Sequence, residues 1–484
     1  MDSIFLPSTT TVILYAAIVV TFIFINERRR LRKPPPSSVA VKRTLSGTMG
    51  WPFIGETLDF ISCGYTDHPQ SFIDKRRLLY GKVFKSHLFG SPTIVSTDAE
   101  VSRMILQSDA KSFVPCYPKS LTELMGESSI LRINGSLHRR IHGLIGSFFK
   151  SPYLKAQVTS NMRKLLMQSM ASWNEDRPIY IQDETKHIAL QVLAKALIGL
   201  DPGEEMEFLR IQFQKFIAGL MSLPIKLPGT QLHRSLEAKK KMVQLVLQII
   251  RDKRINGSSV LQDSKDVVDV LLNDKSEKLT DELISDNMID LMIPGEDSVP
   301  LLITLAIKYL SDCPKALHQL KENLELKRRK KDLGDPLCWD DYLSLPFTQN
   351  VITETLRLGN IIMGVIRKAM KDVEIKGYLI PKGWCVLTHF RSVHLDDNHH
   401  ESPLQFNPWR WQDRDMSSGS STYFTPFGGG LRLCPGLDLA RLEASIFLHH
   451  FVTEFRWVAE DDTIINFPTV RMKNRMPIWV KREN

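Results

Sequence analysis

The stretch Phe427-Gly428-Gly429-Gly430-Leu431-Arg432-Leu433-Cys434-Pro435-Gly436 determines how the rest of the chain is interpreted. Three consecutive glycines let a backbone approach a flat, bulky group. Cys434 stands just before a predicted helix, where free N–H groups and the helix dipole stabilise a thiolate. Arg432 is placed to pair with a carboxylate of the same ligand. A glycine-rich loop with a buried cysteine explains each piece alone, whereas an iron porphyrin meets all of these demands. Because the combined FxxGxRxCxG spacing is very specific, Cys434 is predicted to bind haem iron.

The 484-residue chain has the composition of a globular protein with a substantial core. Hydrophobic residues make up 43% and charged residues 24% of it, and its length allows one large domain or two or three smaller ones. The net charge of +9 is spread along the sequence, and its short basic runs carry no interleaved aromatic residues, which argues against a nucleic-acid partner. The six cysteines stand far apart without a CxxC pair, which predicts a reducing compartment and mostly buried thiols.

Residues 1–27 are predicted to be a transmembrane anchor. Ile4–Ile25 is mostly apolar and about 20 residues long, as a bilayer-spanning helix requires. The basic run Arg28–Lys33 follows it, whereas a cleaved signal peptide carries its charge before the apolar run. This order favours a retained single-pass helix with a luminal amino terminus and a cytosolic body. Residues 28–50 are interpreted as a basic, proline-rich hinge and residues 51–484 as the haem-thiolate domain.

Most of this domain carries a helical pattern. Between about residues 68 and 330 apolar residues recur at helical spacing, interrupted by a few extended pieces such as Val83–Leu88. After residue 360 short β-like runs, among them Val373–Ile375 and Tyr378–Ile380, alternate with Gly and Pro turns, and helix returns at Leu437–Phe455. The sequence therefore predicts a single large domain, mainly α with a minor β-sheet.

A long apolar helix is predicted from Asp281 to about Leu310, with Pro294-Gly295-Glu296-Asp297-Ser298 in its middle. Proline removes a backbone donor and kinks a helix. In one interpretation the freed carbonyl and the small Gly295 make room for dioxygen, while Asp297 and Ser298 supply an acid and a hydroxyl for proton transfer. In the other, two helices simply meet there and Asp297-Ser298 forms an N-cap, which the residues alone slightly favour.

Taken together, these motifs resemble the cytochrome P450 family over essentially the whole sequence. The resemblance implies the P450 fold and a haem b bound through Cys434, with Phe427, Arg432 and Gly436 in the cofactor-binding loop. It implies a monooxygenase supplied with electrons from NADPH by a flavoprotein, the NADPH–cytochrome P450 reductase. Basic residues near Cys434, such as Arg441, are expected to help attract this acidic partner. It also makes Asp297 and Ser298 the catalytic acid–alcohol pair, although Pro294 and Ser298 depart from the family's usual small residue and threonine.

The same resemblance assigns a structural triad. Glu354 and Arg357 stand three residues apart on one helix face, a spacing that is weak evidence by itself. They match the family's ExxR helix, and Arg410 fits the arginine that completes its ion-paired cluster. The triad is expected to lock the loop that carries the haem ligand.

Three further residues are assigned to the haem propionates by resemblance. Many family members use a Trp and an Arg four residues apart in an early helix, where this protein has His138 and His142. Arg367 resembles another propionate-binding arginine of the family.

The sequence most resembles plant steroid hydroxylases of brassinosteroid biosynthesis, through residues 51–57, 292–295 and 367–378. Within that group, residues 222–224, 406–412 and 464–470 resemble the hydroxylases that act at C-23 in the steroid side chain of 22-hydroxylated campestanes. The resemblance implies the endoplasmic reticulum membrane and an apolar pocket lined by residues 113–125, 218–228, 360–365, 467–470 and the helix before Asp297. The alternatives are another steroid or terpenoid hydroxylase, a reductase-independent haem-thiolate isomerase, and a non-catalytic carrier.

Overall fold

The computed structural model describes residues 45–52, 54–256, 265–276, 278–330, 336–412, 421–467 and 469–483, with the backbone alone for residues 256 and 326–330. The predicted anchor at residues 1–27 lies outside the described residues, as does the hinge up to residue 44. Within the described ranges, no helix combines the length and the apolar character needed to cross a bilayer.

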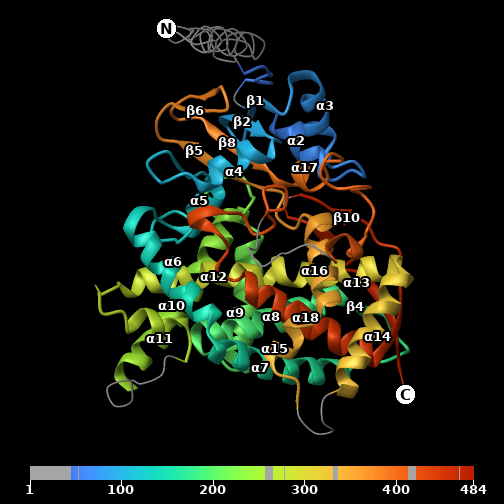
Figure 1. Ribbon diagram of the computed structural model, residues 1–484. Coiled ribbons are helices and arrows are strands. Elements are labelled where there is room, and N and C mark those ends of the chain that lie inside the picture. Colours follow the sequence, from blue (N-terminus) through green and yellow to red (C-terminus); the bar gives the residue numbers. More distant parts are fainter. Residues whose placement is uncertain are drawn as a thin grey trace, which may run out of the picture.

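Helices make up most of the molecule, as the sequence predicts, and Figure 1 shows them filling the body below a small sheet. Their bounds are α2 (Thr57–Cys63), α3 (Ser71–Tyr80), α4 (Ala99–Gln107), α5 (Lys119–Met125), α6 (Gly135–Lys150), α7 (Pro152–Ala171), α8 (Ile181–Ile198), α9 (Glu204–Ile217), α10 (Gln231–Asn256), α11 (Val267–Leu272), α12 (Asp281–Glu296), α13 (Ser298–Asp312), α14 (Pro314–Lys330), α15 (Trp339–Leu343), α16 (Pro346–Gly359), α17 (Phe390–His394) and α18 (Leu437–Glu454).

The largest sheet has five strands in the order β1-β2-β8-β5-β3. Its members are β1 (Val83–Leu88), β2 (Ser91–Ser96), β8 (Cys385–His389), β5 (Gly364–Ala369) and β3 (Phe113–Pro115). Only β2 and β8 run parallel, so the sheet joins an early hairpin to strands that follow α16. Three smaller sheets pair β6 (Val373–Ile375) with β7 (Tyr378–Ile380), β10 (Ile464–Ile465) with β11 (Arg471–Met472), and β4 (Ile179–Tyr180) with β12 (Pro477–Arg482) and β9 (Phe455–Ala459).

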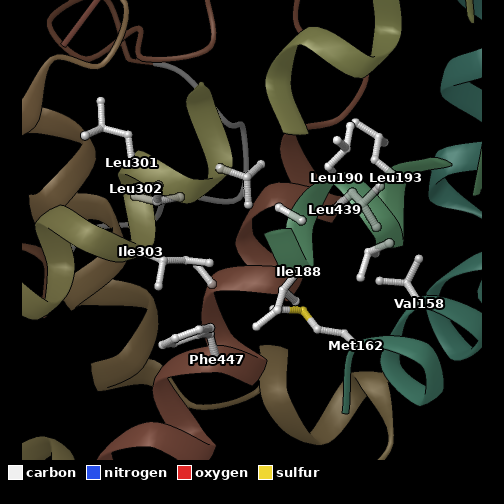
Figure 2. Packing of buried hydrophobic residues seen from close by; sticks show 14 of the residues in the cluster. Val158, Met162, Ile188, Leu190, Leu193, Leu301, Leu302, Ile303, Leu439 and Phe447 are labelled. Carbon is white, nitrogen blue, oxygen red and sulfur yellow. The ribbon is translucent and has the colours of Figure 1, made fainter. Parts of the chain in front are cut away.

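The main core lies where α7, α8, α13 and α18 meet. Figure 2 shows Leu302 and Ile303 of α13, Phe447 of α18, Ile188 of α8 and Met162 of α7 packed together. All five side chains are almost completely buried. Because α13 is apolar on nearly every face and α8 is almost wholly buried from Ile188 to Ile198, both helices lie in the interior. The adjoining α12 packs against them there.

The predicted long helix is two helices that meet at Asp297. The Asp297 N–H donates to the Ile293 carbonyl at 3.2 Å, but its side chain makes no capping hydrogen bond to α13. The interpretation as a helix break is therefore correct, while the proposed N-cap role of the Asp297 side chain is wrong. Gly295 does not widen a channel: a Cβ there would lie 3.1 Å from Leu193 and 3.4 Å from the Ala189 carbonyl, so the glycine allows α8 to pack closely.

Candidate functional site

Cys434 lies on a loop between a short 3₁₀ turn, Gly430–Arg432, and the start of α18. Its N–H donates to the Phe427 carbonyl at 3.1 Å, which closes the loop on itself. Gly430 has a φ of +66°, and a Cβ on it would collide with the Leu106 carbonyl at the end of α4. This glycine therefore serves the packing of the loop on α4, which corrects the expectation that the whole glycine run faces a ligand.

The thiol of Cys434 is not ready to ionise by itself. Burial raises its pKa, and the Gly436 N–H offsets only part of that increase. The start of α18 is thus insufficient to hold a thiolate, whereas a bound metal cation would remove the thiol proton. Of the six cysteines only Cys385 is classed as buried, so the prediction of mostly buried thiols is wrong.

A group of basic side chains gathers near this loop, and we call His138, His142, Arg367 and Arg432 the basic cluster. Burial, together with the charge of the nearby Arg367, lowers the pKa of Arg432 to about 10. Burial likewise lowers the pKa of Arg367, with the nearby Tyr117 acting electrostatically in the opposite direction. These shifts show that the two guanidiniums lie in a poorly hydrated region and repel each other.

The two histidines of the basic cluster behave differently. His138 is only 4% exposed, and burial, followed by the charges of Arg432, His142 and Arg367, lowers its pKa to about 4. His142 lies one helical turn further along, with its ring 5.3 Å from that of His138. Its Nε2 donates to the Leu433 carbonyl at 2.8 Å, so it holds the Cys434 loop directly. The structure therefore brings His138 to the two arginines and turns His142 toward the loop.

These residues fit a haem. Among the described residues, Arg432 donates to the Ile130 carbonyl at 3.1 Å, to Asn134 Oδ1 at 2.8 Å and to the Ile133 carbonyl, but pairs with no carboxylate. Arg367 likewise has no carboxylate partner in the described part of the protein. Buried cations without anions are unfavourable. A planar ligand that carries two carboxylates and a metal would satisfy the basic cluster and Cys434 together.

The predicted triad forms a buried ion-paired network. Arg357 donates to both oxygens of Glu354, through Nη2 at 2.8 Å and Nε at 2.9 Å, and both side chains are fully buried. Arg410 Nε donates to Glu354 Oε1 at 3.0 Å. Burial acts to raise the pKa of Glu354, but the hydrogen bonds and charges of Arg357 and Arg410 outweigh it and hold the pKa below its usual value.

Sequence reasoning missed the residues that connect this triad to the Cys434 loop. Trp411 Nε1 donates to Glu354 Oε2 at 2.8 Å, and the Trp411 ring lies 4.8 Å from that of Phe424. The His394 carbonyl accepts from Arg357 at 2.9 Å, while its ring nitrogen Nε2 accepts from the Thr425 N–H at 3.0 Å. Phe424 and Thr425 precede the loop, so the triad supports it through these contacts. Only the aromatic and histidine content of residues 394–411 hinted at this role.

Asp297 and Ser298 stand where α12 ends and α13 begins. Burial raises the pKa of Asp297; Lys186 and Arg471 act to lower it, and Glu296 to raise it. The adjacent Glu296 is turned away, with its carboxylate 2.9 Å from Lys186. A carboxyl with a raised pKa beside a hydroxyl can hold and transfer a proton, which is the chemistry predicted for this pair.

Several of the stretches predicted to line a pocket meet in one apolar cluster. Met221, Met363 and Phe467 come from three of them and pack around Leu387 and Phe60. The Ser120 hydroxyl donates to the Leu220 carbonyl at 2.9 Å, which joins the first stretch to the second. Asn360, the first residue of another predicted pocket stretch, makes polar contacts instead. The Asn360 side chain bonds to His394 and to the Arg357 carbonyl, beside the triad.

Arg441, expected to help attract an acidic redox partner, instead bridges two helices inside the protein. Its Nη1 donates to Thr353 Oγ1 at 3.0 Å on α16, and burial lowers its pKa to about 10. A guanidinium held there is not available at a docking surface, so that expectation is wrong.

Comparison with known proteins agrees with this geometry. The family model described as Cytochrome P450 matches residues 45–477. The chain is 65% identical to 3-epi-6-deoxocathasterone 23-monooxygenase CYP90D1 of Arabidopsis thaliana, over 90% of this chain and 89% of that protein. It is 63% identical to Cytochrome P450 90D2 of Oryza sativa subsp. japonica (91% and 90%) and 52% identical to 3-epi-6-deoxocathasterone 23-monooxygenase CYP90C1 of Arabidopsis thaliana (90% and 84%). The solved structure of retinoic acid bound cyanobacterial CYP120A1 superimposes with a TM-score of 0.80, covering 92% of this chain and 100% of that one, at 24% identity, a likeness of fold.

The triad yields the first testable prediction. Glu354→Ala removes the carboxylate from between two buried guanidiniums, so the free energy of unfolding should fall by about 3–5 kcal/mol and haem content should drop. Urea denaturation and the haem-to-protein ratio measure both effects.

The contribution of Glu354 to stability should also depend on pH. Because Glu354 has a lowered pKa, its stabilisation is present at neutral pH and is lost as the pH falls through that lowered value.

Glu207→Ala is the matched control for this variant. Glu207 and Arg210 have the same spacing along a helix as Glu354 and Arg357, but they lie on the surface. Their pair should contribute nothing measurable. Equal losses in the two variants would contradict the structural role of the buried triad.

Proposed function

The chain belongs to the cytochrome P450 family, and from that premise we propose that it hydroxylates C-23 of 22-hydroxylated campestane steroids in brassinosteroid biosynthesis. The observation that carries the proposal is the likeness, along nine-tenths of the sequence, to two proteins named as 23-monooxygenases. The relative named 3beta,22alpha-dihydroxysteroid 3-dehydrogenase has a lower sequence identity, 42%, over a similar length of the chain. This difference favours oxidation of the steroid side chain over reaction at the A ring.

The proposed cofactor is haem b, held by Cys434 as the iron ligand. His138, Arg367 and Arg432 would bind its propionates, because they are buried or half-buried basic groups close to one another without a carboxylate partner among the described residues. Phe427 and Gly436 lie on either side of Cys434 in its loop, and the Phe427 carbonyl accepts from the Cys434 N–H. His142 holds the same loop through the Leu433 carbonyl. When bound, the haem supplies the oxidising chemistry that inserts one atom of dioxygen into a C–H bond.

Asp297 and Ser298 are proposed to deliver the protons that this reaction consumes. The Asp297 carboxyl has a raised pKa, so it holds a proton closer to neutral pH than an exposed aspartate does. Ser298 follows Asp297 directly in the sequence, at the break between α12 and α13, and the Asp297 carboxyl is not used for capping. This arrangement suits a relay in which the hydroxyl passes on a proton from the carboxyl.

Electrons are proposed to come from NADPH through the NADPH–cytochrome P450 reductase, in the endoplasmic reticulum membrane. The apolar, basic-flanked start of the sequence supports a single-pass anchor with the catalytic domain in the cytosol. The exposed apolar side chains of Trp51, Leu58, Leu78 and Leu79 support it too. They lie on or next to α2 and α3, at the end of the molecule where the described residues begin (Figure 1).

The second prediction tests the reaction. Microsomes that contain the full-length protein and the reductase should convert a 22-hydroxylated campestane steroid, in the presence of NADPH, into a product with one additional oxygen at C-23, identified by mass spectrometry and NMR. Cys434→Ser should abolish both this product and the thiolate-type spectrum of the reduced CO complex.

The alternatives give different results in the same assay. Turnover without NADPH would indicate the reductase-independent isomerase. Oxygen at another carbon, or turnover only of other steroids or terpenoids, would indicate a different hydroxylase. A thiolate-type spectrum without turnover of any such compound would indicate a carrier.

The third prediction concerns the proton relay. Asp297→Asn should lower kcat by about 10²-fold or more, because proton transfer by a positioned group contributes that much. The spectrum of the CO complex should not change, and less product should form per NADPH oxidised. Ser298→Thr keeps the hydroxyl and should retain most of the activity, whereas Ser298→Ala should not. A fully active Asp297→Asn enzyme would exclude this role.

The fourth prediction concerns the anchor. The full-length protein should remain in the microsomal membrane after extraction with alkaline carbonate, and a variant without residues 1–27 should be largely released. Protease added outside intact microsomes should digest the body of the protein, because that body faces the cytosol. Release of the full-length protein by carbonate, or protection of its body, would refute the proposed topology.

A further inference from the structure

One buried aspartate of α12, Asp290, has no role in the mechanism above. Asp290 is only 4% exposed, and neither of its carboxyl oxygens makes a hydrogen bond of normal geometry with any described residue. A carboxyl removed from water without donors is strongly unfavourable. A position that keeps such a group therefore points to a partner outside the protein itself.

The groups around Asp290 do not supply that partner. Lys239 acts on it electrostatically, but the Lys239 ammonium is already paired with Asp286 at 2.8 Å and donates to the Met125 carbonyl at 2.9 Å. The Ser129 hydroxyl is close enough to lower its pKa without forming a normal hydrogen bond. Despite Ser129 and Lys239, burial raises the pKa of Asp290 to about 7, so at neutral pH the carboxyl can donate a hydrogen bond as well as accept one.

Asp290 also lies in the right part of the fold to meet a ligand of the site. It precedes Asp297, the C-cap of α12, by seven residues, which is about two helical turns. The charge of Asp290 also acts on Tyr117, and Tyr117 in turn lies within the electrostatic reach of Arg367 and Arg432 of the basic cluster. Asp290 is thus on the helix that leads to the proton-relay residues and is electrostatically coupled to a neighbour of the basic cluster.

We propose that the Asp290 carboxyl binds a hydroxyl group of the steroid substrate and so selects hydroxylated steroids. This inference rests on the proposed function. A neutral hydroxyl suits the position better than an anion, since a carboxylate placed there would be repelled by Asp286 and by Asp290 itself. A site built to bond a hydroxyl also discriminates strongly, because an analogue without it leaves the buried carboxyl unpaired.

The chemistry fits either hydroxyl of the proposed substrate, at C-22 of the side chain or at C-3 of the A ring. Two matched pairs of steroids separate these sources: one pair with and without the 22-hydroxyl, and one pair with a 3-hydroxyl or a 3-oxo group. For each steroid, kcat/KM and the dissociation constant from the substrate-induced spectral change are measured on the reductase-supported holoenzyme.

The fifth prediction follows from these measurements. The wild-type enzyme should prefer the hydroxylated member of one pair, and Asp290→Leu should reduce that preference by about tenfold or more while the spectrum of the CO complex stays unchanged. Asp290→Asn, which can still donate and accept, should keep most of the preference. Asp286→Asn is the matched control from the same helix: it disturbs the pair with Lys239 and should leave the preference intact.

Each other outcome is informative. If Asp290→Leu weakens all steroids equally, or changes nothing, Asp290 is not a hydroxyl-binding residue, and the inference fails. It also fails if the wild-type enzyme shows no preference within either pair. If Asp290→Leu does not incorporate haem, Asp290→Ala is judged by the same criteria. Absence of turnover of any steroid by the wild-type enzyme would instead overturn the proposed function.

Discussion

The buried carboxylate of Glu354 is the constraint on which the rest of the site depends. An ionised group without water is tolerated only when donors surround it. Here the donors are Arg357 on the same helix and Arg410, Trp411 and the Asn407 N–H, which come from 53 to 57 residues further along the sequence. The charge can therefore be buried only when the segment between residues 394 and 411 lies against α16. Once it does, His394 and Trp411 hold the residues that lead into the Cys434 loop.

The basic cluster and Cys434 differ from Glu354, because their charges are not balanced by other groups of the protein. Arg367 and His138 are buried and Arg432 is half-buried, with no carboxylate beside them among the described residues. Cys434 is a thiol whose poorly hydrated surroundings oppose ionisation. A porphyrin with two carboxylates and a metal cation would pair both kinds of group at once. Binding of the cofactor and stability of the fold should accordingly be linked, since the same groups are unfavourable without it.

Local patterns in the sequence were sufficient for much of this description. The β-like runs and turn residues predicted β1, β6 and β7 with the observed bounds. The spacing of Glu354 and Arg357 was weak evidence alone, and the resemblance to the family's ExxR helix was needed to predict their pairing. What sequence reasoning missed depends on distant contacts. Trp411 and His394 acquire their roles only when residues far apart meet. Gly295 and Gly430 were correctly recognised as positions that need a small residue, but the neighbour that approaches each is another helix, α8 or α4, and no local pattern says which side is crowded.

Asp286 and Asp290 show that the hydrogen-bond partners of an acidic side chain say more about its role than its residue type does. Both are aspartates on α12, one turn apart, and the sequence does not distinguish them. Lys239 of α10 pairs with Asp286 and has its remaining hydrogen bond on Met125, so one acid is neutralised within the protein and the other is not. The difference arises from which side chain the ammonium reaches. A buried acid with its own cation contributes to structure, whereas a buried acid without one is kept at a cost in stability that a bound hydroxyl would relieve.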